Sequence, residues 1–197
     1  MRITKNNQLE SKLSREEVRG LAYLAFKQGT LDKSESGILR NLIAMREIIV
    51  KEVMTPRTVV YTLRANQTVR EVIKPGPPRF SRIPIIGDSP DDVKGMVHRY
   101  DLFRMLKEGS LDIAMEKLAQ PIHAVPEQAH LRIVLQTFID RQEQLFLVVD
   151  EYGGVSGIIT LEDALETLLG VEIIDETDSI KDMQKFALYK FYYRKKD

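Results

Sequence analysis

The amino-acid sequence predicts an α/β (α+β) protein, in which two tandem β-α-β-β-α repeats form one disc-like pair behind an N-terminal helical extension. The pattern Gly-x-x-x-x-x-Asp occurs at 95–101 and again at 157–163, so the chain repeats with a period of about 62 residues. Each copy ends a short apolar run and begins a helical pattern, which is typical of a strand-to-helix junction. The first 50 residues lack this pattern and show helical periodicity instead.

Two helices are predicted ahead of the repeats. Ser14 and Glu17 have the spacing of a capping box, and the apolar segment after them stops at Gly29, which favours a helix over roughly 15–28. A second helix is expected over roughly 34–47. Its apolar face consists of Ile38, Leu39, Leu42 and Ile43.

The first repeat is interpreted in the order strand, helix, strand, strand, helix. Residues 74–79 contain three prolines, which remove hydrogen-bond donors and restrict their predecessors, so this segment is a loop that leads to Phe80 and Arg82. The expected elements are a strand at 59–63, a helix opened by Thr68, strands at 83–86 and 93–97, and a helix that ends at Gly109.

The second repeat follows the same order, with a hairpin turn at Tyr152, Gly153 and Gly154. Its expected elements are a strand at 122–125, a helix carrying Leu131, Val134, Leu135 and Phe138, strands at 145–149 and 155–159, and a helix at 161–169. The predicted organisation is therefore a helical extension at 1–50, repeats at 51–112 and 113–172, and an acidic connector with a C-terminal tail at 173–197.

Composition excludes several classes of function. Lysine and arginine number 29, as do aspartate and glutamate, so the formal net charge is zero and a nucleic-acid partner is not favoured. The absence of cysteine excludes a disulfide framework, a thiolate metal site and a cysteine nucleophile. No apolar run reaches the roughly 20 residues that span a bilayer, and the polar N-terminal segment lacks the apolar core of a signal peptide.

The second copy of the repeated pattern carries the candidate chemistry. Thr160 stands at a predicted helix N-cap, where its hydroxyl and the neighbouring amides can meet a phosphate, and Asp163 can accept hydrogen bonds from a ribose diol. Arg82 can pair with phosphate, and Phe80 can stack on a base. Thr-x-x-Asp is also the spacing of a capping box, so helix stability alone is the alternative interpretation. The recurrence of the frame at both junctions favours a shared site.

Four segments resemble one known family. They are Val53-Met54-Thr55-Pro56-Arg57, Phe80-Ser81-Arg82-Ile83-Pro84-Ile85, Val148-Val149-Asp150-Glu151-Tyr152-Gly153-Gly154 and Gly157-Ile158-Ile159-Thr160-Leu161-Glu162-Asp163. Together they resemble the cystathionine-β-synthase-type (CBS) domain pair of the CorC/HlyC and cyclin M (CNNM) group, which is linked to magnesium and cobalt transport or efflux. The resemblance covers residues 10–178, including the helical lead-in.

The resemblance implies a binding site for ATP or another adenine nucleotide between the two repeats, with Mg²⁺ held through the phosphates. It places Thr55 near the ribose and phosphates, Phe80 on the base and Arg82 on phosphate. Thr160 and Asp163 then contact phosphate and ribose, and Ser81 and Ile83 complete the segment around Arg82. Phe80 stands where the family often has tyrosine, so stacking is kept and a hydroxyl contact is lost.

The family context also predicts partners. It implies a homodimer through the faces of the paired repeats and a membrane transport domain in the same or another chain. The chain would then be cytoplasmic, as the cytosolic part of an inner-membrane or plasma-membrane protein. The equivalent cleft in the first repeat depends on His98 and Asp101, and we expect it to be empty or weak because histidine caps helices less well than threonine.

Two other functions stay open. A ligand-independent dimerisation scaffold would use the same fold, and nucleotide would not change its melting temperature. A nucleotide hydrolase would need a general base and phosphate-clamping groups; the sequence has no Gly-x-x-x-x-Gly-Lys-Ser/Thr loop, so no catalytic residue is assigned and an enzyme is not expected. No metal ligands are assigned either, because the histidines at 98, 123 and 130 lack ligand spacing and the carboxylates between 172 and 178 are typical of a solvated linker.

Overall fold

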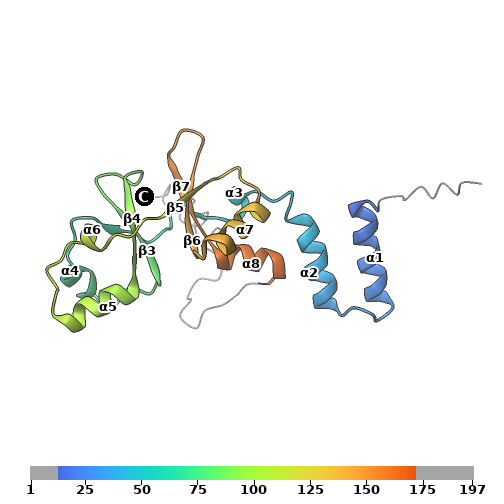
Figure 1. Cartoon of the computed structure of the whole chain (residues 1–197), viewed down its shortest axis with the longest axis horizontal. Coiled ribbons are helices and arrows are strands. Elements are labelled where there is room, and N and C mark those ends of the chain that lie inside the picture. Colours follow the sequence, from blue (N-terminus) through green and yellow to red (C-terminus); the bar gives the residue numbers. More distant parts are fainter. Residues whose placement is uncertain (1–12, 172–197) are drawn as a thin grey trace, which may run out of the picture.

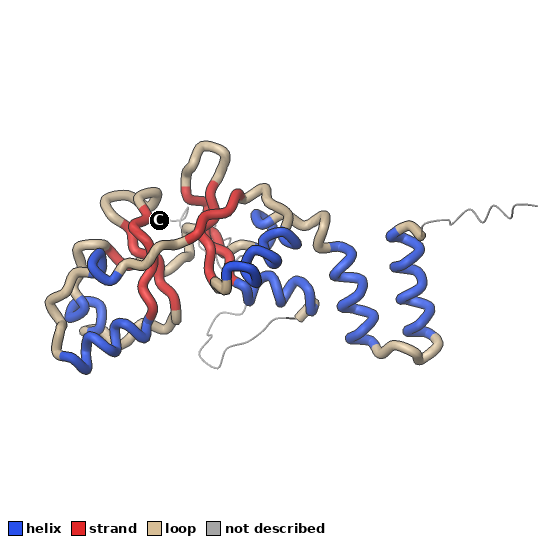
Figure 2. Tube along the Cα trace, in the orientation of Figure 1, coloured by secondary structure: helices blue, strands red, loops and turns tan. Residues whose placement is uncertain are grey.

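The computed structural model describes residues 13–171. Two α/β units lie next to each other along the long axis of the molecule, and two helices, α1 and α2, extend from one end (Figure 1). The strands of both units gather in the middle, while α4, α5 and α6 lie at the opposite end from α1 (Figure 2). The predicted connector and tail at 173–197 lie outside the described residues.

The two leading helices form where the sequence predicts them. α1 covers Arg15–Lys27 and α2 covers Lys33–Ala44, so the second helix ends three residues earlier than expected. Ser14 and Asp32 each cap their helix with a complete capping box, which satisfies amide groups that the first turn leaves without partners. α1 packs on α2, and α2 packs in turn on α8.

The first unit has the predicted order of elements. A parallel pair of strands, β2 and β3, is extended by β4 in antiparallel register, which gives the order β2-β3-β4. The strand expected at 59–63 is displaced, because residues 57–59 form a turn and only two residues pair as β2. The elements are β2 (Leu63–Arg64), α4 (Val69–Ile73), β3 (Arg82–Ile86), β4 (Val93–His98) and α5 (Arg99–Glu108).

The second unit repeats this arrangement, with a first strand, β5, that is longer than its counterpart β2. Its sheet has the order β1-β7-β6-β5, and its core is centred on the stacked rings of Phe138 and Phe146, whose centroids lie 3.9 Å apart. The hairpin turn forms as predicted, with Gly153 at a positive φ of 82°. The elements are β5 (His123–Pro126), α7 (Leu131–Arg141), β6 (Leu145–Val149), β7 (Val155–Thr160) and α8 (Leu161–Leu169).

The first segment of each repeat packs on the other repeat. The short helix α3 (Val50–Val53) and strand β1 (Thr55–Pro56) join the second unit, where β1 pairs antiparallel with β7. The short helix α6 (Met115–Leu118) in turn buries Met115 in the first core, and Gln120 pairs with Met96 of β4. The two units are therefore interlocked.

The glycine of each repeated pattern makes this interlocking possible. A Cβ atom on Gly157 would collide with the main-chain oxygen of Thr55 in β1, and one on Gly95 would collide with that of Gln120. A residue with a side chain at either position would push the incoming segment off the sheet edge. The repeated glycine thus serves the packing of the crossing strands.

None of the helices within residues 13–171 combines the length and apolar composition that crossing a membrane requires.

Candidate functional site

Thr160 and Asp163 lie at the junction where β7 becomes α8. The Asp163 carboxylate accepts hydrogen bonds from the Thr160 amide at 2.7 Å and from the Thr160 hydroxyl at 2.8 Å, and the Asp163 amide donates to that hydroxyl at 3.2 Å. Both side chains are half-buried. Thr160 and Asp163 therefore cap α8. The positive end of the α8 dipole also lies at this junction, where it favours the binding of an anion.

Thr55 lies at the same end of the second sheet. It occupies β1 opposite Ile158, two residues before Thr160 on the neighbouring strand, and its side chain is half-buried. The structure therefore brings Thr55, Thr160 and Asp163 together, although Thr55 belongs to the first segment of the first repeat. The sequence order alone would have assigned Thr55 to the other unit.

The segment from Phe80 to Ile83 lies at the start of β3 in the first sheet. Phe80 and Ser81 are exposed, Arg82 is half-buried, and Ile83 is completely buried in the first core. A ligand can thus meet the side chains of the first three residues, whereas Ile83 supports the strand from the core side. Within residues 13–171 Arg82 forms no ion pair, so its guanidinium charge is not neutralised by a carboxylate there.

Tyr61 is a candidate that the sequence analysis missed. Its ring lies 5.7 Å from the ring of Phe80, at an interplanar angle of 32°, and both rings are exposed. A tilted aromatic pair of this kind offers a planar apolar surface to a base. In the sequence, Tyr61 is recognisable only as an aromatic residue just ahead of β2. The sequence does not show that its ring lies beside Phe80 in the folded chain.

The corresponding junction in the first unit is organised differently. His98 stands at the N-cap of α5 but makes no side-chain capping bond. The Asp101 carboxylate is buried, accepts a hydrogen bond from Gln120 at 3.1 Å and pairs with Arg104 at 3.0 Å. This carboxylate already has two partners within the protein, so the two junctions are not equivalent.

A second buried carboxylate, Glu127, stabilises the interlocking segment. Lys51 of α3 donates to it at 2.6 Å and Ser156 of β7 donates at 2.7 Å. These hydrogen bonds, that from Lys51 above all, hold the pKa of Glu127 below its ordinary value, while burial acts in the opposite direction. The network holds α3 against the second sheet.

No cluster of three or more metal-ligating side chains occurs among residues 13–171. His123 packs edge-on against Phe146, with ring centroids 5.0 Å apart. The acidic residues between 172 and 178 lie outside the described part of the chain.

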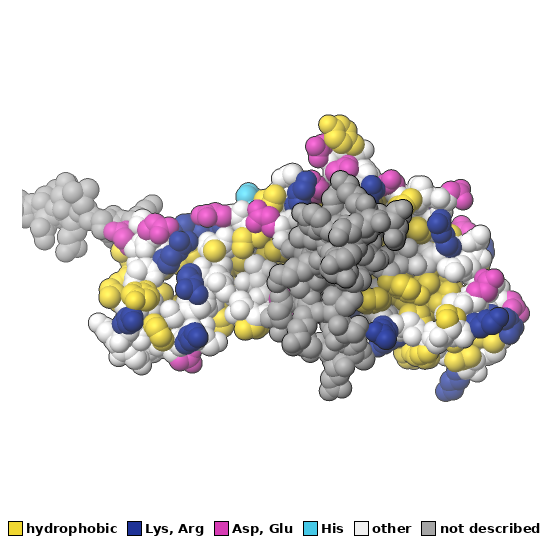
Figure 3. All heavy atoms as spheres, turned by 180° about the vertical axis from the view of Figure 1, so that it is seen from behind, with side chains coloured by type: hydrophobic (Ala, Val, Ile, Leu, Met, Phe, Trp, Pro, Cys, Tyr) yellow, Lys and Arg dark blue, Asp and Glu magenta, His cyan; other side chains and the backbone are white. Residues whose placement is uncertain are grey.

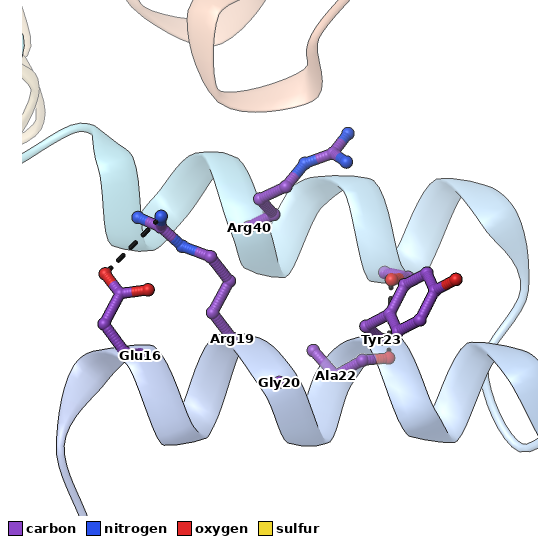
Figure 4. Close-up of a pocket in the computed structure, with 7 residues that line it drawn as sticks. Glu16, Arg19, Gly20, Ala22, Tyr23 and Arg40 are labelled. Carbon is purple, nitrogen blue, oxygen red and sulfur yellow. Dashed lines mark hydrogen bonds and ion pairs between the residues drawn. The ribbon is translucent and has the colours of Figure 1, made fainter.

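A groove of about 390 Å³ lies between α1 and α2, away from both junctions. In Figure 4 the Arg19 side chain extends toward Glu16, with which it pairs at 3.5 Å. The Arg40 side chain extends away from this ion pair. The charged groups therefore do not converge on a common point.

The family model of the CBS domain matches residues 50–108 and 112–170. The chain belongs to this family and carries two CBS domains in tandem. Among curated relatives, it is 34% identical over 178 residues to the UPF0053 protein sll1254 of Synechocystis sp., covering 88% of this chain and 50% of that protein. It is 29% identical over 174 residues to the magnesium and cobalt efflux protein CorC of Escherichia coli, covering 86% of this chain and 58% of that protein.

Solved structures agree with this assignment. The CBS domain of a bacterial CNNM/CorC family Mg²⁺ transporter superimposes with a TM-score of 0.76 at 28% identity, covering 83% of this chain and all of that one. Its complex with ATP gives a TM-score of 0.65 at 28% identity, covering 70% and 98% of the two chains. A CBS-domain pair with bound AMP from Klebsiella pneumoniae gives 0.56 at 30% identity, covering 62% and 99%. The pair is thus related to the CBS modules of CorC and CNNM transporters and of hemolysin-like proteins.

Proposed function

We propose that this chain is a regulatory CBS pair that binds an adenine nucleotide, ATP with Mg²⁺, and belongs to a CorC/HlyC-type magnesium or cobalt transport system. The observation that carries the proposal is the junction of β7 and α8, where Thr160, Asp163 and Thr55 gather at a helix N-terminus. Related pairs bound to ATP and to AMP support the choice of ligand.

The proposed site residues contact the base, the ribose and the phosphates of the nucleotide. The exposed ring of Phe80, with Tyr61 beside it, stacks on the base. Asp163 accepts hydrogen bonds from the ribose hydroxyls, for which its carboxylate turns from the Thr160 main chain toward the ligand. Arg82 and the amides at the start of α8 bind phosphate.

Magnesium enters through the phosphates. One arginine and a helix N-terminus supply too little positive charge for a triphosphate, and the Asp163 carboxylate adds a negative charge. Mg²⁺ binds phosphate oxygens readily and keeps several waters, so it needs no set of protein ligands. ATP is therefore expected to bind more tightly with Mg²⁺ than without it.

The biological role follows from the relatives and is part of the proposal. The chain spans about half the length of the curated relatives it matches. We assign it to the cytosolic side of a membrane transport domain in the same or another chain. Nucleotide binding biases that domain, which requires different affinities for two arrangements of the module.

A homodimer through the CBS faces completes the proposal. Apolar side chains are visible on the surface at both ends of the molecule (Figure 3), and α5 of the first unit exposes Tyr100, Phe103 and Leu106. Such a patch marks an interaction surface. Basic and acidic side chains are interspersed on the face shown in Figure 3, so charge does not select an oppositely charged partner.

Calorimetric titration of ATP, with and without Mg²⁺, tests the proposal. We expect Mg²⁺-dependent binding that Thr160→Ile abolishes, because isoleucine fills the junction and loses the cap. Melting curves check that the variant still folds. No heat and no thermal shift with ATP, ADP or AMP would leave a dimerisation scaffold as the function. ATP turnover that disappears in Asp163→Ala would instead indicate a hydrolase.

A further inference from the structure

The loop between β3 and β4 reaches from the first unit to the second. The carboxylate of Asp91 in this loop accepts a hydrogen bond from the main-chain amide of Val155, at the start of β7, at 2.8 Å. The same oxygen pairs with the Arg57 guanidinium at 3.1 Å. The Arg57 amide in turn donates to the carbonyl of Ser156 at 2.9 Å. Asp91 thus joins three chain segments, and we name this contact the Asp91 clamp.

The clamp lies at the far end of the two strands that carry the site. β3 begins with Arg82 and leads through the hairpin loop to Asp91, while β7 begins at Val155 and ends at Thr160. Five steps along a strand span about 17 Å. Because strands are stiff, a rotation of one unit about the clamped end changes the gap between Arg82 and Thr160 at the other end.

Among residues 13–171, the hairpin of the second unit forms no equivalent clamp. In its hairpin, Asp150 accepts hydrogen bonds from the amides of Tyr152 at 2.9 Å and Gly154 at 2.7 Å. Its carboxylate therefore shapes its own turn, whereas Asp91 leaves its hairpin and reaches the other unit. The asymmetry shows that Asp91 is not simply a residue that every hairpin of this repeat requires.

We propose that Asp91 is a positioning residue for nucleotide binding. Through the clamp it fixes the distance between two half-sites: one at the start of β3, with Phe80 and Arg82, and one at the junction of β7 and α8, with Thr160 and Asp163. This inference rests on the proposed function and adds a residue that does not touch the ligand. A ligand held by both half-sites binds more weakly when their separation is not fixed beforehand.

The two contacts of the clamp differ in strength. The Arg57 and Asp91 side chains are 51% and 49% exposed, and ion pairs so open to water contribute little. The hydrogen bond from the Val155 amide to a charged acceptor is the stronger contact. Asp91→Asn keeps an oxygen that can accept this bond, whereas Asp91→Ala removes both contacts.

Titration of ATP with Mg²⁺ into a matched set of variants tests the inference. We expect Asp91→Ala to weaken ATP binding at least about fivefold, the lower end of ordinary coupling between sites. Asp91→Asn and Arg57→Ala should stay closer to the parent. Asp112→Ala is the control, because Asp112 forms a still more exposed ion pair with Arg70 that stays inside the first unit. Its affinity should equal that of the parent.

A distance measurement separates positioning from general destabilisation. The chain has no cysteine, so spin labels can be placed on Lys107→Cys in α5 and Arg132→Cys in α7, which are both exposed and lie in different units. We expect one narrow distance distribution in the parent, a broader one in Asp91→Ala, and narrowing when ATP and Mg²⁺ are added. Val72→Ala, a truncation inside the first core, should lower the melting temperature without broadening the distribution.

The outcomes distinguish this inference from the proposed function. A parent that binds ATP, with an Asp91→Ala variant of equal affinity and equal distance distribution, would overturn the positioning role and leave the function standing. A parent that does not bind ATP would overturn the proposed function and with it the effect on affinity. If Val72→Ala weakened ATP binding as much as Asp91→Ala at the same melting temperature, the loss of affinity would follow from destabilisation, and this result would also contradict the inference.

Discussion

Thr160 and Asp163 are hydrogen-bonded to each other in a complete capping box. A nucleotide at this junction would therefore exchange an internal contact for an external one, which lowers the net gain from the ribose contact. Phe80 is different, because its exposed ring lies against only one described aromatic partner, Tyr61. At the scale of single residues, most of the binding free energy is expected from the base and the phosphates.

We predict that Phe80→Ala weakens ATP binding by about 5- to 150-fold, since stacking of a base on an aromatic side chain contributes about 1–3 kcal/mol. Phe80→Tyr keeps the ring and should bind as well as the parent. Fluorescence or calorimetric titration measures both. Equal affinities for Phe80→Ala and the parent would remove Phe80 from the site.

Because the pKa of Glu127 is lowered in the folded protein, we predict that the free energy of unfolding depends on pH. Its folded-state pKa lies below the ordinary value of 4.5 because Lys51 and Ser156 donate to the carboxylate. Its stabilising contribution is therefore complete above pH 4.5 and is lost as the pH falls through the folded-state pKa. Glu127→Gln should unfold at lower urea concentration than the parent at pH 7, and the difference should shrink toward pH 3. A difference that stays constant between these pH values would contradict this account.

At the scale of elements, the crossing strand β1 depends on a glycine. Gly157→Ala places a methyl group against the main chain of Thr55, so we predict a loss of about 1–3 kcal/mol in the free energy of unfolding, as for an overpacked core. Gly20→Ala is the control, because Gly20 lies inside helix α1 with open space around its Cα. This change should stabilise the protein by about 0.5–1 kcal/mol. Urea unfolding measures both free energies. An unchanged free energy of unfolding in Gly157→Ala would show that β1 and β7 do not pack closely enough to require glycine.

The repeats themselves were predictable from local pattern. Apolar runs with turn residues between them identified β3, β4, β6 and β7, and capping boxes identified the starts of α1 and α4. The displaced strand β2 and the short elements α3, β1 and α6 were not predictable, because a strand of two residues has no period of its own and forms only where a neighbouring edge accepts it.

At the scale of the whole molecule, the two junctions are not interchangeable. Asp101 is tied to Gln120 and Arg104, whereas Asp163 caps its own helix. We predict one nucleotide per chain by calorimetry. Asp101→Asn should leave the affinity unchanged, and Asp163→Asn should lower it by about five- to tenfold, because the ribose hydroxyls then donate to a neutral amide oxygen and no longer to a charged carboxylate. Two nucleotides per chain, or equal effects of the two changes, would contradict this assignment.

The candidate site was only partly visible in the sequence. The pairing of Thr160 with Asp163 follows from their spacing on a helix, and the structure shows it. The contact of Tyr61 with Phe80, the burial of Ile83 and the place of Thr55 on the second sheet required the folded chain. Each of these depends on how segments distant in sequence pack together.

The sequence by itself determined the repeat, the order of strands and helices in each copy and the polar residues at the second strand-to-helix junction, because these follow from periodicity, capping and turn chemistry within a few residues. Only the tertiary structure decided that each unit is completed by the first segment of the other repeat, and that Asp91 ties the first hairpin to β7. These contacts are made by main-chain edges and single side chains that lie in separate elements of the chain, such as Asp91 and Val155, which are 64 residues apart, so no local pattern encodes them.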